Sequence, residues 1–260
     1  MIDASREDIL EGPLLRVLVV LAGPLVAQNF ALVAQSVVDL FWVGRLGGAA
    51  VAAVGFATVV AGLLVVPLRM FFTGSQVVTS QRVGADDAAG ARRVPFTATT
   101  MAVTTAAVLG VGTVLAAEPV TDLFVDDAAV ATFAVDYLTA YAVALVAIAA
   151  SDTLESGFTG WGDTRAALYV NLVAILVNVV VDPLLILGWG PFPRMEVFGA
   201  ALATAVGYAV GAAFALALAA RGREEFRLTG EALRPDVGTA REVLDVGAPV
   251  AGQSAGRQVA

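Results

Sequence analysis

Six long runs of hydrophobic residues fill most of the chain, and short stretches rich in glycine, proline and charged residues separate them. An α-helix needs about twenty apolar residues to cross roughly 30 Å of hydrocarbon at a rise of about 1.5 Å per residue. The pattern therefore predicts an all-α membrane protein built on a six-transmembrane-helix bundle. The predicted crossings are residues 14–43, 50–72, 96–117, 130–157, 167–188 and 197–220.

A polar stretch after the sixth run, RGREEFRLTGEALRPDVGTAREV, interrupts this pattern. We interpret it as a cytoplasmic linker between two lobes. The predicted domains are a six-helix N-terminal lobe over residues 1–220, the linker over 221–241, and the start of a seventh helix, which opens a second lobe, over 242–260.

The end of the chain resembles its beginning. VLDVGAPVAGQ is similar to VLVVLAGPLVAQ, and pairing Pro249 with Pro24 also pairs Gln253 with Gln28, 225 residues apart. Many transporters are built from two parallel repeats of this kind. We therefore expect a truncated chain that is the first half of a two-lobe protein and whose partner is a missing C-terminal lobe.

Arginine is distributed unevenly between the two sides of the predicted membrane. With the N-terminus inside, eleven arginines fall on that side, whereas only Arg45 and Arg194 fall outside. The connection EPVTDLFVDDAA on the outer side is acidic and contains no arginine. The positive-inside rule therefore predicts a multi-pass protein of the cell membrane whose N-terminus and linker are cytoplasmic. Arg69 is left inside the second crossing, where we expect its side chain to reach the headgroups.

Composition narrows the chemistry. The chain has no His and no Cys, and arginine supplies all fifteen of its Lys+Arg residues. Imidazole and thiolate metal sites, a Ser-His-Asp triad and a lysine phosphate-binding loop are therefore excluded. The formal net charge of −8 argues against a nucleic-acid binder. We predict a protein that is not an enzyme and has no cofactor.

Several polar residues are predicted at a similar depth inside the crossings. A charge near the bilayer centre costs about 2.5 to 3.5 kcal/mol, so a carboxylate there calls for a partner, an ion or a proton. Asn178 and Asp182 are four residues apart and share a helix face. With Asp39, Thr204 and Tyr137 at a comparable depth, they predict a cation-binding cluster, and the oxygens of Asp39, Asn178, Asp182 and Thr204 suit Na+.

Proline follows the second of these carboxylates directly. Pro183 removes a backbone donor and bends a helix. We expect protonation or cation binding at Asp182 to favour one of two helix shapes. The alternative is a static kink beside a paired aspartate.

A second acidic pair lies nearer the inner side. Asp152 and Glu155 are three residues apart on one face of the fourth crossing. They are either cavity acids that attract cationic substrates or interfacial acids, solvated or paired with Arg165. The polar residues predicted to line a substrate cavity are Gln28, Asn29, Gln35, Asp152 and Glu155.

Four stretches resemble a known transporter family. They are VVDLFWVGRLGGAAVAAVG, SQRVGADDAAGARR, GWGDTRAALYVNLVAILVNVVVDPLLILGWG and VFGAALATAVG. In this order they resemble the N-terminal lobe of MATE (multidrug and toxic compound extrusion) transporters, most closely the prokaryotic DinF-like branch. The resemblance implies two six-helix lobes around a V-shaped cavity, and export of organic, often cationic, compounds driven by inward flow of H+ or Na+.

The resemblance also implies site residues. In that branch an N-lobe cation site is formed by residues that fall here on Asp39, Asn178, Asp182 and Thr204, with Tyr137 nearby. Where relatives often carry amides in the fourth helix, this chain has Asp152 and Glu155, which implies a more acidic cavity.

The resulting hypothesis is a cation-coupled antiporter, using H+ or Na+, that exports small organic compounds through the lipid membrane. One alternative is a lipid-linked oligosaccharide flippase of the same superfamily, although such proteins usually favour basic cavity residues. The other alternative is a non-transporting membrane lobe or fragment.

Overall fold

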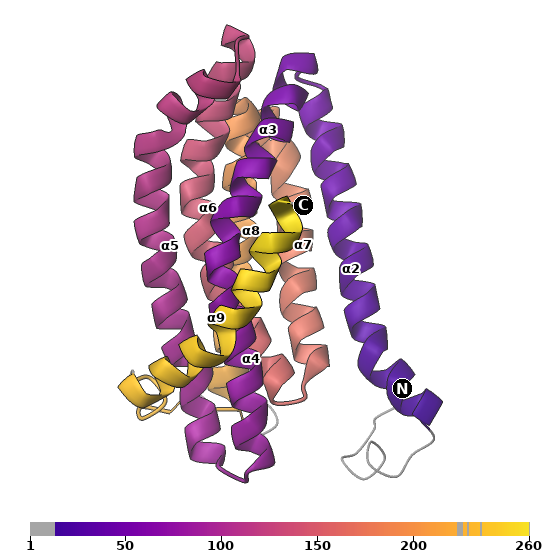
Figure 1. Cartoon of the computed structure of the whole chain (residues 1–260). Coiled ribbons are helices and arrows are strands. Elements are labelled where there is room, and N and C mark those ends of the chain that lie inside the picture. The colour runs from indigo at the N-terminus through magenta and orange to yellow at the C-terminus, as the bar shows by residue number, and fades with distance from the viewer. Residues whose placement is uncertain (1–13, 223–225, 228, 235, 260) are drawn as a thin grey trace.

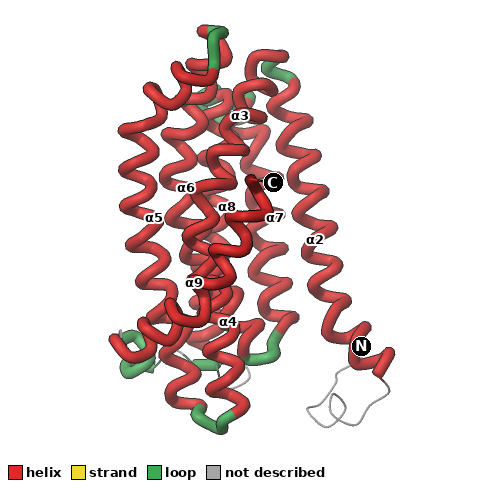
Figure 2. Tube along the Cα trace, in the orientation of Figure 1, coloured by secondary structure: helices red, strands yellow, loops and turns green. Residues whose placement is uncertain are grey.

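The computed structural model describes residues 14–222, 226–227, 229–234 and 236–259, and the regular elements in this part of the chain are helices (Figures 1 and 2). They are α2 (Leu14–Gly44), α3 (Gly48–Val65), the 3-10 helix η1 (Val66–Leu68), α4 (Arg69–Gly84), α5 (Ala88–Phe124), α6 (Ala128–Gly160), α7 (Thr164–Ile186), α8 (Glu196–Arg221) and α9 (Val237–Val259). Within these residues six helical stretches are long and apolar enough to cross a membrane. The predicted all-α membrane bundle is confirmed.

Two crossings are longer than predicted. The second continues through η1 and α4 to Gly84, because Pro67 only tightens one turn and does not end the helix. The polar residues after position 72 are accommodated by a neighbouring helix: Ser75 Oγ donates to the carbonyl of Thr153 at 3.1 Å. The third crossing begins at Ala88, upstream of Pro95, and extends beyond Pro119 to Phe124. The prolines that we expected to bound helices therefore lie inside them.

Acidic residues in the connections fix where three helices begin. Asp87 accepts a hydrogen bond from the amide of Gly90, Asp127 from Ala129 and Val130, and Asp163 from Ala166, at 2.9 to 3.0 Å. Such N-caps satisfy backbone donors that a helix cannot pair internally. They start α5, α6 and α7 two to eight residues before the predicted crossings at 96, 130 and 167.

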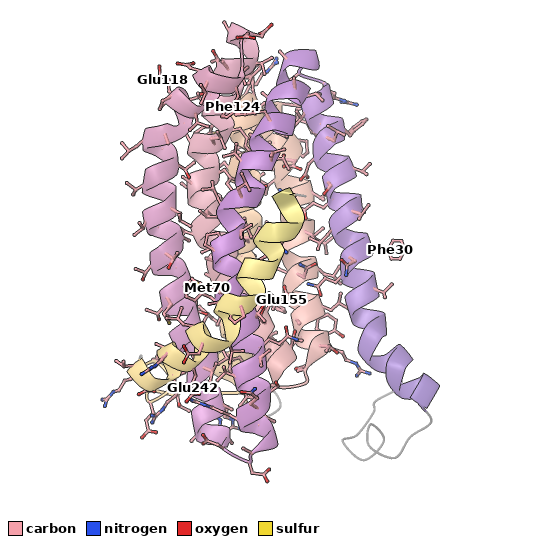
Figure 3. The ribbon with its side chains drawn as sticks, viewed as in Figure 1. Phe30, Met70, Glu118, Phe124, Glu155 and Glu242 are labelled. Atoms are coloured by element: carbon pink, nitrogen blue, oxygen red, sulfur yellow. The ribbon has the colours of Figure 1, made fainter. Side chains whose placement is uncertain are left out.

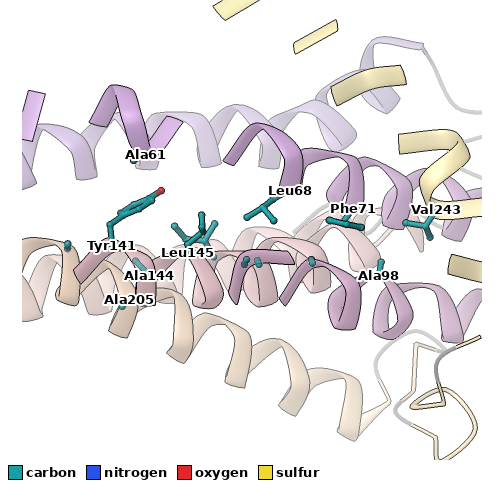
Figure 4. Close-up of a cluster of buried hydrophobic side chains, with 14 of the residues drawn as sticks. Ala61, Leu68, Phe71, Ala98, Tyr141, Ala144, Leu145, Ala205 and Val243 are labelled. Carbon is teal, nitrogen blue, oxygen red and sulfur yellow. The ribbon is translucent and has the colours of Figure 1, made fainter. Parts of the chain in front are cut away.

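Helix α6 lies at the centre of the bundle and packs against α3, α4, α5, α7 and α8. Small residues allow this close packing, as expected between helices in lipid. A Cβ atom at Gly157 would lie 2.6 Å from the ring of Pro95, so glycine is required where α6 meets the proline of α5. Leu68, Phe71 and Tyr141 contribute larger side chains to this core (Figure 4).

One residue of the polar linker is buried against the lobe. Phe226 is 1% exposed, and its ring stacks on Phe96 at a centroid distance of 5.7 Å and meets Phe158 edge to face at 4.7 Å. One aromatic residue thus attaches the linker to the ends of α5 and α6.

Helix α9 runs diagonally across α4 (Figure 1). It begins at Val237, inside the stretch that we predicted as linker, because Asp236 caps it. Val243 packs beside Phe71 and Ala98 (Figure 4). This packing needs Gly74 on α4, where an added Cβ would lie 2.4 Å from the carbonyl oxygen of Val243.

Candidate functional site

The predicted cation cluster is assembled between α2 and α7. Gln35 Nε2 donates to Asn178 Oδ1 at 2.7 Å, and Asn178 Nδ2 lies 3.4 Å from Asp182 Oδ1. With the Asn178 amide turned over, its nitrogen lies 3.2 Å from Asp39 Oδ1 instead. The Asn178 amide thus lies between Gln35 and Asp39 of α2 on one side and Asp182 of α7 on the other.

The two carboxyl groups of this cluster meet. Asp39 and Asp182 are within hydrogen-bonding reach of each other. Asp182 is 1% exposed, and its Oδ2 atom has no donor among the described residues. Two carboxylate oxygens in contact repel unless a proton or a cation lies between them. The cluster therefore has an unpaired acceptor and an excess of negative charge, and one proton or cation would satisfy both.

Tyr137 and Thr204 border the cluster from α6 and α8. Tyr137 is close enough to interact electrostatically with both Asp39 and Asp182. The Thr204 backbone nitrogen lies 3.2 Å from the Asn178 amide, whereas the Thr204 hydroxyl donates to Ala200 O of its own helix at 3.2 Å. All five predicted cation-site residues are thus brought together, although the hydroxyl of Thr204 is turned to its own backbone.

A cavity of about 540 Å³ opens beside this cluster. Polar groups from four helices line it: Gln35, Ser36, Asp39, Thr58, Tyr137, Tyr141, Thr204 and Tyr208. The rest of its wall is aliphatic. Such a mixture of apolar wall and a few convergent polar groups is typical of a small-molecule site.

Pro183 lies close to the C-terminal end of α7. The helix ends at Ile186, only three residues after the proline, and Leu187 N donates to the carbonyl of Pro183 at 3.3 Å. A kink at this proline would redirect only the end of the helix. Asp182 lies in that end segment, and the two helix shapes expected to depend on its charge remain a prediction.

The second acidic pair lies in the opposite half of α6. Glu155 Oε1 accepts a hydrogen bond from Gln28 Nε2 at 2.5 Å. Asp152, one turn earlier, lies within electrostatic range of Arg69 at the start of α4. Arg69, which we expected to act as a headgroup anchor, thus also supplies positive charge to this pair.

The five predicted cavity residues therefore do not form one site. Gln35 belongs to the Asp39–Asp182 cluster, whereas Gln28, Asp152 and Glu155 form a second cluster. Asn29 is exposed on α2, where it lines a separate hollow with Val26, Phe30 and Val33. Adjacent residues of a helix point about 100° apart, so Gln28 and Asn29 cannot both face α6.

Among the polar residues of these sites that sequence reasoning missed, which include the cavity residues Ser36 and Thr58, three have larger side chains. Tyr141 stacks on Tyr137 at a centroid distance of 6.0 Å, and Tyr208 also lines the cavity. The four-residue spacing of Tyr137 and Tyr141 was a usable signal, because it places both rings on one helix face. Asn171, buried on α7, is the third.

Comparisons with known proteins agree with this architecture. The sequence pattern of the MatE family matches residues 24–184. A FAD transporter of Shewanella oneidensis is 28% identical over 202 residues, which cover 77% of this chain and 44% of that protein. A probable multidrug resistance protein NorM of Deinococcus radiodurans is 30% identical over 207 residues, 80% of this chain and 46% of that protein.

Solved structures share the fold. A MATE protein in a bent conformation matches with a TM-score of 0.81 and 21% identity, over 96% of this chain and 55% of that one. An outward-facing multidrug resistance MATE transporter of the MOP superfamily matches with a TM-score of 0.78 and 22% identity, with the same coverage. The chain spans about half the length of the curated relatives it matches. Because the family pattern covers more than half of its residues, the chain belongs to the MatE family.

Proposed function

We propose that this chain is the N-terminal lobe of a cation-coupled antiporter that exports organic cations across the cell membrane. The observation that carries the proposal is the contact between Asp39 and Asp182 beside a cavity large enough for a small organic molecule. The cavity wall contains Asp39 and no basic residue. Its charge favours a positively charged substrate.

Coupling would follow from the charge of the two carboxyl groups. Without a bound cation, Asp39 and Asp182 repel each other, and binding of a proton or Na+ removes that repulsion. A bound ion shifts a conformational equilibrium only as far as its affinities for the two states differ. Since α2 and α7 meet through Gln35 and Asn178, the helix contact at this site would differ between the occupied and empty states.

The contact itself favours H+ over Na+. Two carboxyl groups within hydrogen-bonding reach form a bond when one is protonated. The hydroxyl of Thr204, one of the four predicted Na+ ligands, is engaged with Ala200 O. We therefore propose H+ as the coupling ion, bound within the site pattern of the DinF-like branch.

In this proposal, export requires a second lobe in addition to this chain. The relatives are about twice as long as the region that matches. We propose that a second six-helix lobe completes the cavity, and that the N-terminus and the linker are cytoplasmic. Because the acidic cluster and the cavity lie side by side, a non-transporting lobe is the less favoured alternative.

Anionic substrates fit this lobe poorly. One relative is a FAD transporter, and FAD carries a pyrophosphate. The wall residues Asp39, Tyr137 and Tyr208 offer that group no positive charge. The same argument disfavours a lipid-linked oligosaccharide flippase, whose headgroup is anionic.

Export of a fluorescent cationic dye from vesicles that hold the two-lobe transporter tests the proposal. pH and Na+ gradients are imposed separately, and a pH gradient is expected to suffice. Asp39→Asn and Asp182→Asn should each reduce gradient-driven export at least tenfold. Asp136→Asn, which removes an exposed carboxylate beside Tyr137, is the matched control and should leave export unchanged. Intact coupled export in both cluster variants would contradict the scheme.

A further inference from the structure

The acidic pair on α6 is separate from the proposed coupling site. Gln28, which contacts Glu155, and Gln35, which contacts Asn178, are seven residues apart on α2, which corresponds to about 10 Å along the axis. Figure 3 shows Glu155 below the level of Phe30 and above that of Glu242. The coupling scheme above makes no use of it.

Hydrogen-bond acceptors around Glu155 outnumber the donors. Oε1 accepts from Gln28 of α2, and the Asn171 amide of α7 also lies within hydrogen-bonding reach of this carboxylate. Oε2 of Glu155 and Oδ1 of Asn171 are both fully buried, and neither has a donor among the described residues. Both of these unpaired atoms are acceptors. Buried acceptors without donors are rare and costly, so the site calls for a ligand that brings N–H or O–H groups.

The charge of the site points to the same ligand. Asp152 acts electrostatically on Glu155, and Arg69 acts on Asp152. Gln28 and Asn171 are neutral. Two carboxylates and one guanidinium leave an excess of negative charge when both carboxyl groups are ionised. A ligand with donor hydrogens and one positive charge satisfies both requirements.

Two tyrosines that line the cavity beside Asp39 also lie near this pair. Tyr208 lines that cavity and lies within electrostatic range of Asp39, Asp152 and Glu155. Tyr141, which also lines it, lies within range of Asp152. Aromatic rings of this cavity therefore lie near both acidic clusters, where they offer an organic molecule a flat apolar surface and a face attractive to cations.

We propose that Glu155 Oε2, Asn171 Oδ1 and Asp152 form a binding site for the protonated amine of an organic substrate. The inference rests on the proposed export of organic cations and adds a specificity: the cationic nitrogen must carry hydrogens. An ammonium with N–H bonds fills both free acceptors. A quaternary ammonium of the same charge and ring system fills neither and leaves them buried and unpaired.

Equilibrium binding to the purified chain in nanodiscs, without any gradient, tests this site. The probes are a fluorescent aromatic tertiary amine, protonated at the working pH, and its quaternary N-methyl derivative. The amine is expected to bind at least tenfold more tightly. Glu155→Gln, which keeps the shape of the side chain, should reduce this preference to less than threefold. Asn171→Ala, which leaves the charge of Glu155 in place, should also reduce it.

Glu118→Gln provides the matched control, because it removes an exposed carboxylate at the far end of α5. It should leave both affinities and their ratio unchanged. Equal binding of the two probes to the unmodified chain, or an unchanged preference in both Glu155→Gln and Asn171→Ala, would overturn the proposal. A third outcome also overturns it: Glu155→Gln abolishes pH-driven export while both affinities stay as before, which would make the pair a proton site.

Failure of this inference is distinguishable from failure of the proposed function. The amine preference is measured at equilibrium, whereas coupling is measured as gradient-driven export with Asp39→Asn and Asp182→Asn. If coupling is absent and the preference persists, the binding site stands without the antiporter. If coupling depends on Asp39 and Asp182 but the preference is absent, the antiporter stands without this site.

Discussion

Gln35 of α2 donates a 2.7 Å hydrogen bond to the side-chain oxygen of Asn178 of α7, and both residues are buried. The bond joins two helices far apart in sequence at the level of the carboxyl groups of Asp39 and Asp182. It makes Gln35 a structural member of the proposed coupling site. Gln35 also lines the adjacent cavity, which is the role that its position in the sequence suggested.

Gln35→Leu should therefore destabilise the lobe. Leucine fills a similar volume but leaves the buried Asn178 side-chain amide without its Gln35 partner, which costs about 1 kcal/mol for an interhelical bond in a membrane protein and up to about 3 kcal/mol for a buried polar group. Thermal unfolding of the purified chain in detergent measures the effect. Ser36→Ala is the control, since that exposed hydroxyl bonds only Leu32 O of its own helix. Equal unfolding temperatures for Gln35→Leu and the unmodified chain would show that the bond does not hold α2 to α7.

Phe226→Ala should detach the linker from the lobe. The ring is fully buried between Phe96, Phe158 and Trp161, and truncation of a buried phenylalanine costs about 3 to 5 kcal/mol. Trypsin cleavage of the linker at Arg227 and Arg234 should become faster. Leu233→Ala, at a residue of the same linker that is 54% exposed, should leave the cleavage rate unchanged. A similar rate for both variants would contradict the anchoring role.

Gly74→Ala should displace α9 from α4. The added Cβ would lie 2.4 Å from Val243 O and 2.7 Å from Val243 Cγ1, and overpacking of this kind costs about 1 to 3 kcal/mol. Because the chain contains no cysteine, spin labels can be attached to cysteines introduced at the exposed positions Ser80 and Arg241. The distance between them should lengthen or broaden in Gly74→Ala.

Gly84→Ala is the matched control for that experiment. It lies on the same helix, α4, and an added Cβ there meets no atom within 4 Å. The distance distribution should match that of the unmodified chain. An unaltered distribution in Gly74→Ala as well would mean that α9 does not pack closely at this point.

The stability of the first turn of α9 should depend on pH. The backbone and hydroxyl of Thr239 donate to Asp236 Oδ2 at 2.7 and 2.8 Å and lower the pKa of this carboxyl below 3.8. A depressed pKa means that the cap stabilises the folded state above 3.8 and loses this effect as the pH falls through the folded-state pKa. Hydrogen exchange of the Thr239 amide should accelerate over that range.

Asp236→Asn should remove most of this pH dependence, because an asparagine cap does not ionise. Asp245→Asn serves as the control: that carboxyl lies on the same helix, is largely exposed and pairs with Arg241 at 3.8 Å. Its variant should retain the acceleration. The cap assignment fails if Asp236→Asn and the unmodified chain exchange identically at every pH.

The crossings and the polar residues inside them were predictable because both leave local signals. Apolar runs of sufficient length predicted the six spans that the structure confirms, and the cost of a charge in lipid singled out Asp39 and Asp182. Helix ends were less predictable. The caps at Asp87, Asp127 and Asp163 are polar, so hydropathy alone placed the starts of those helices too late.

The grouping of the polar residues was not predictable, because it depends on how helices rotate and pack. Gln28 and Gln35 lie two turns apart on α2, yet one contacts Glu155 and the other Asn178. Sequence spacing fixes which residues share a helix face, but not which neighbour that face meets. For the same reason the roles of Arg69, Asn171 and Tyr208 became visible only in three dimensions.

Hydrophobic length and the scarcity of charge in lipid thus determined, from sequence alone, a six-helix membrane lobe with buried carboxyl groups. Tertiary packing decided that Asp39 and Asp182 meet and that Glu155 belongs to a separate cluster with Gln28. The physical reason is that the free energy of placing a segment in lipid depends on the residues of that segment alone. Contacts between carboxyl and amide groups depend instead on the rotation and separation of whole helices.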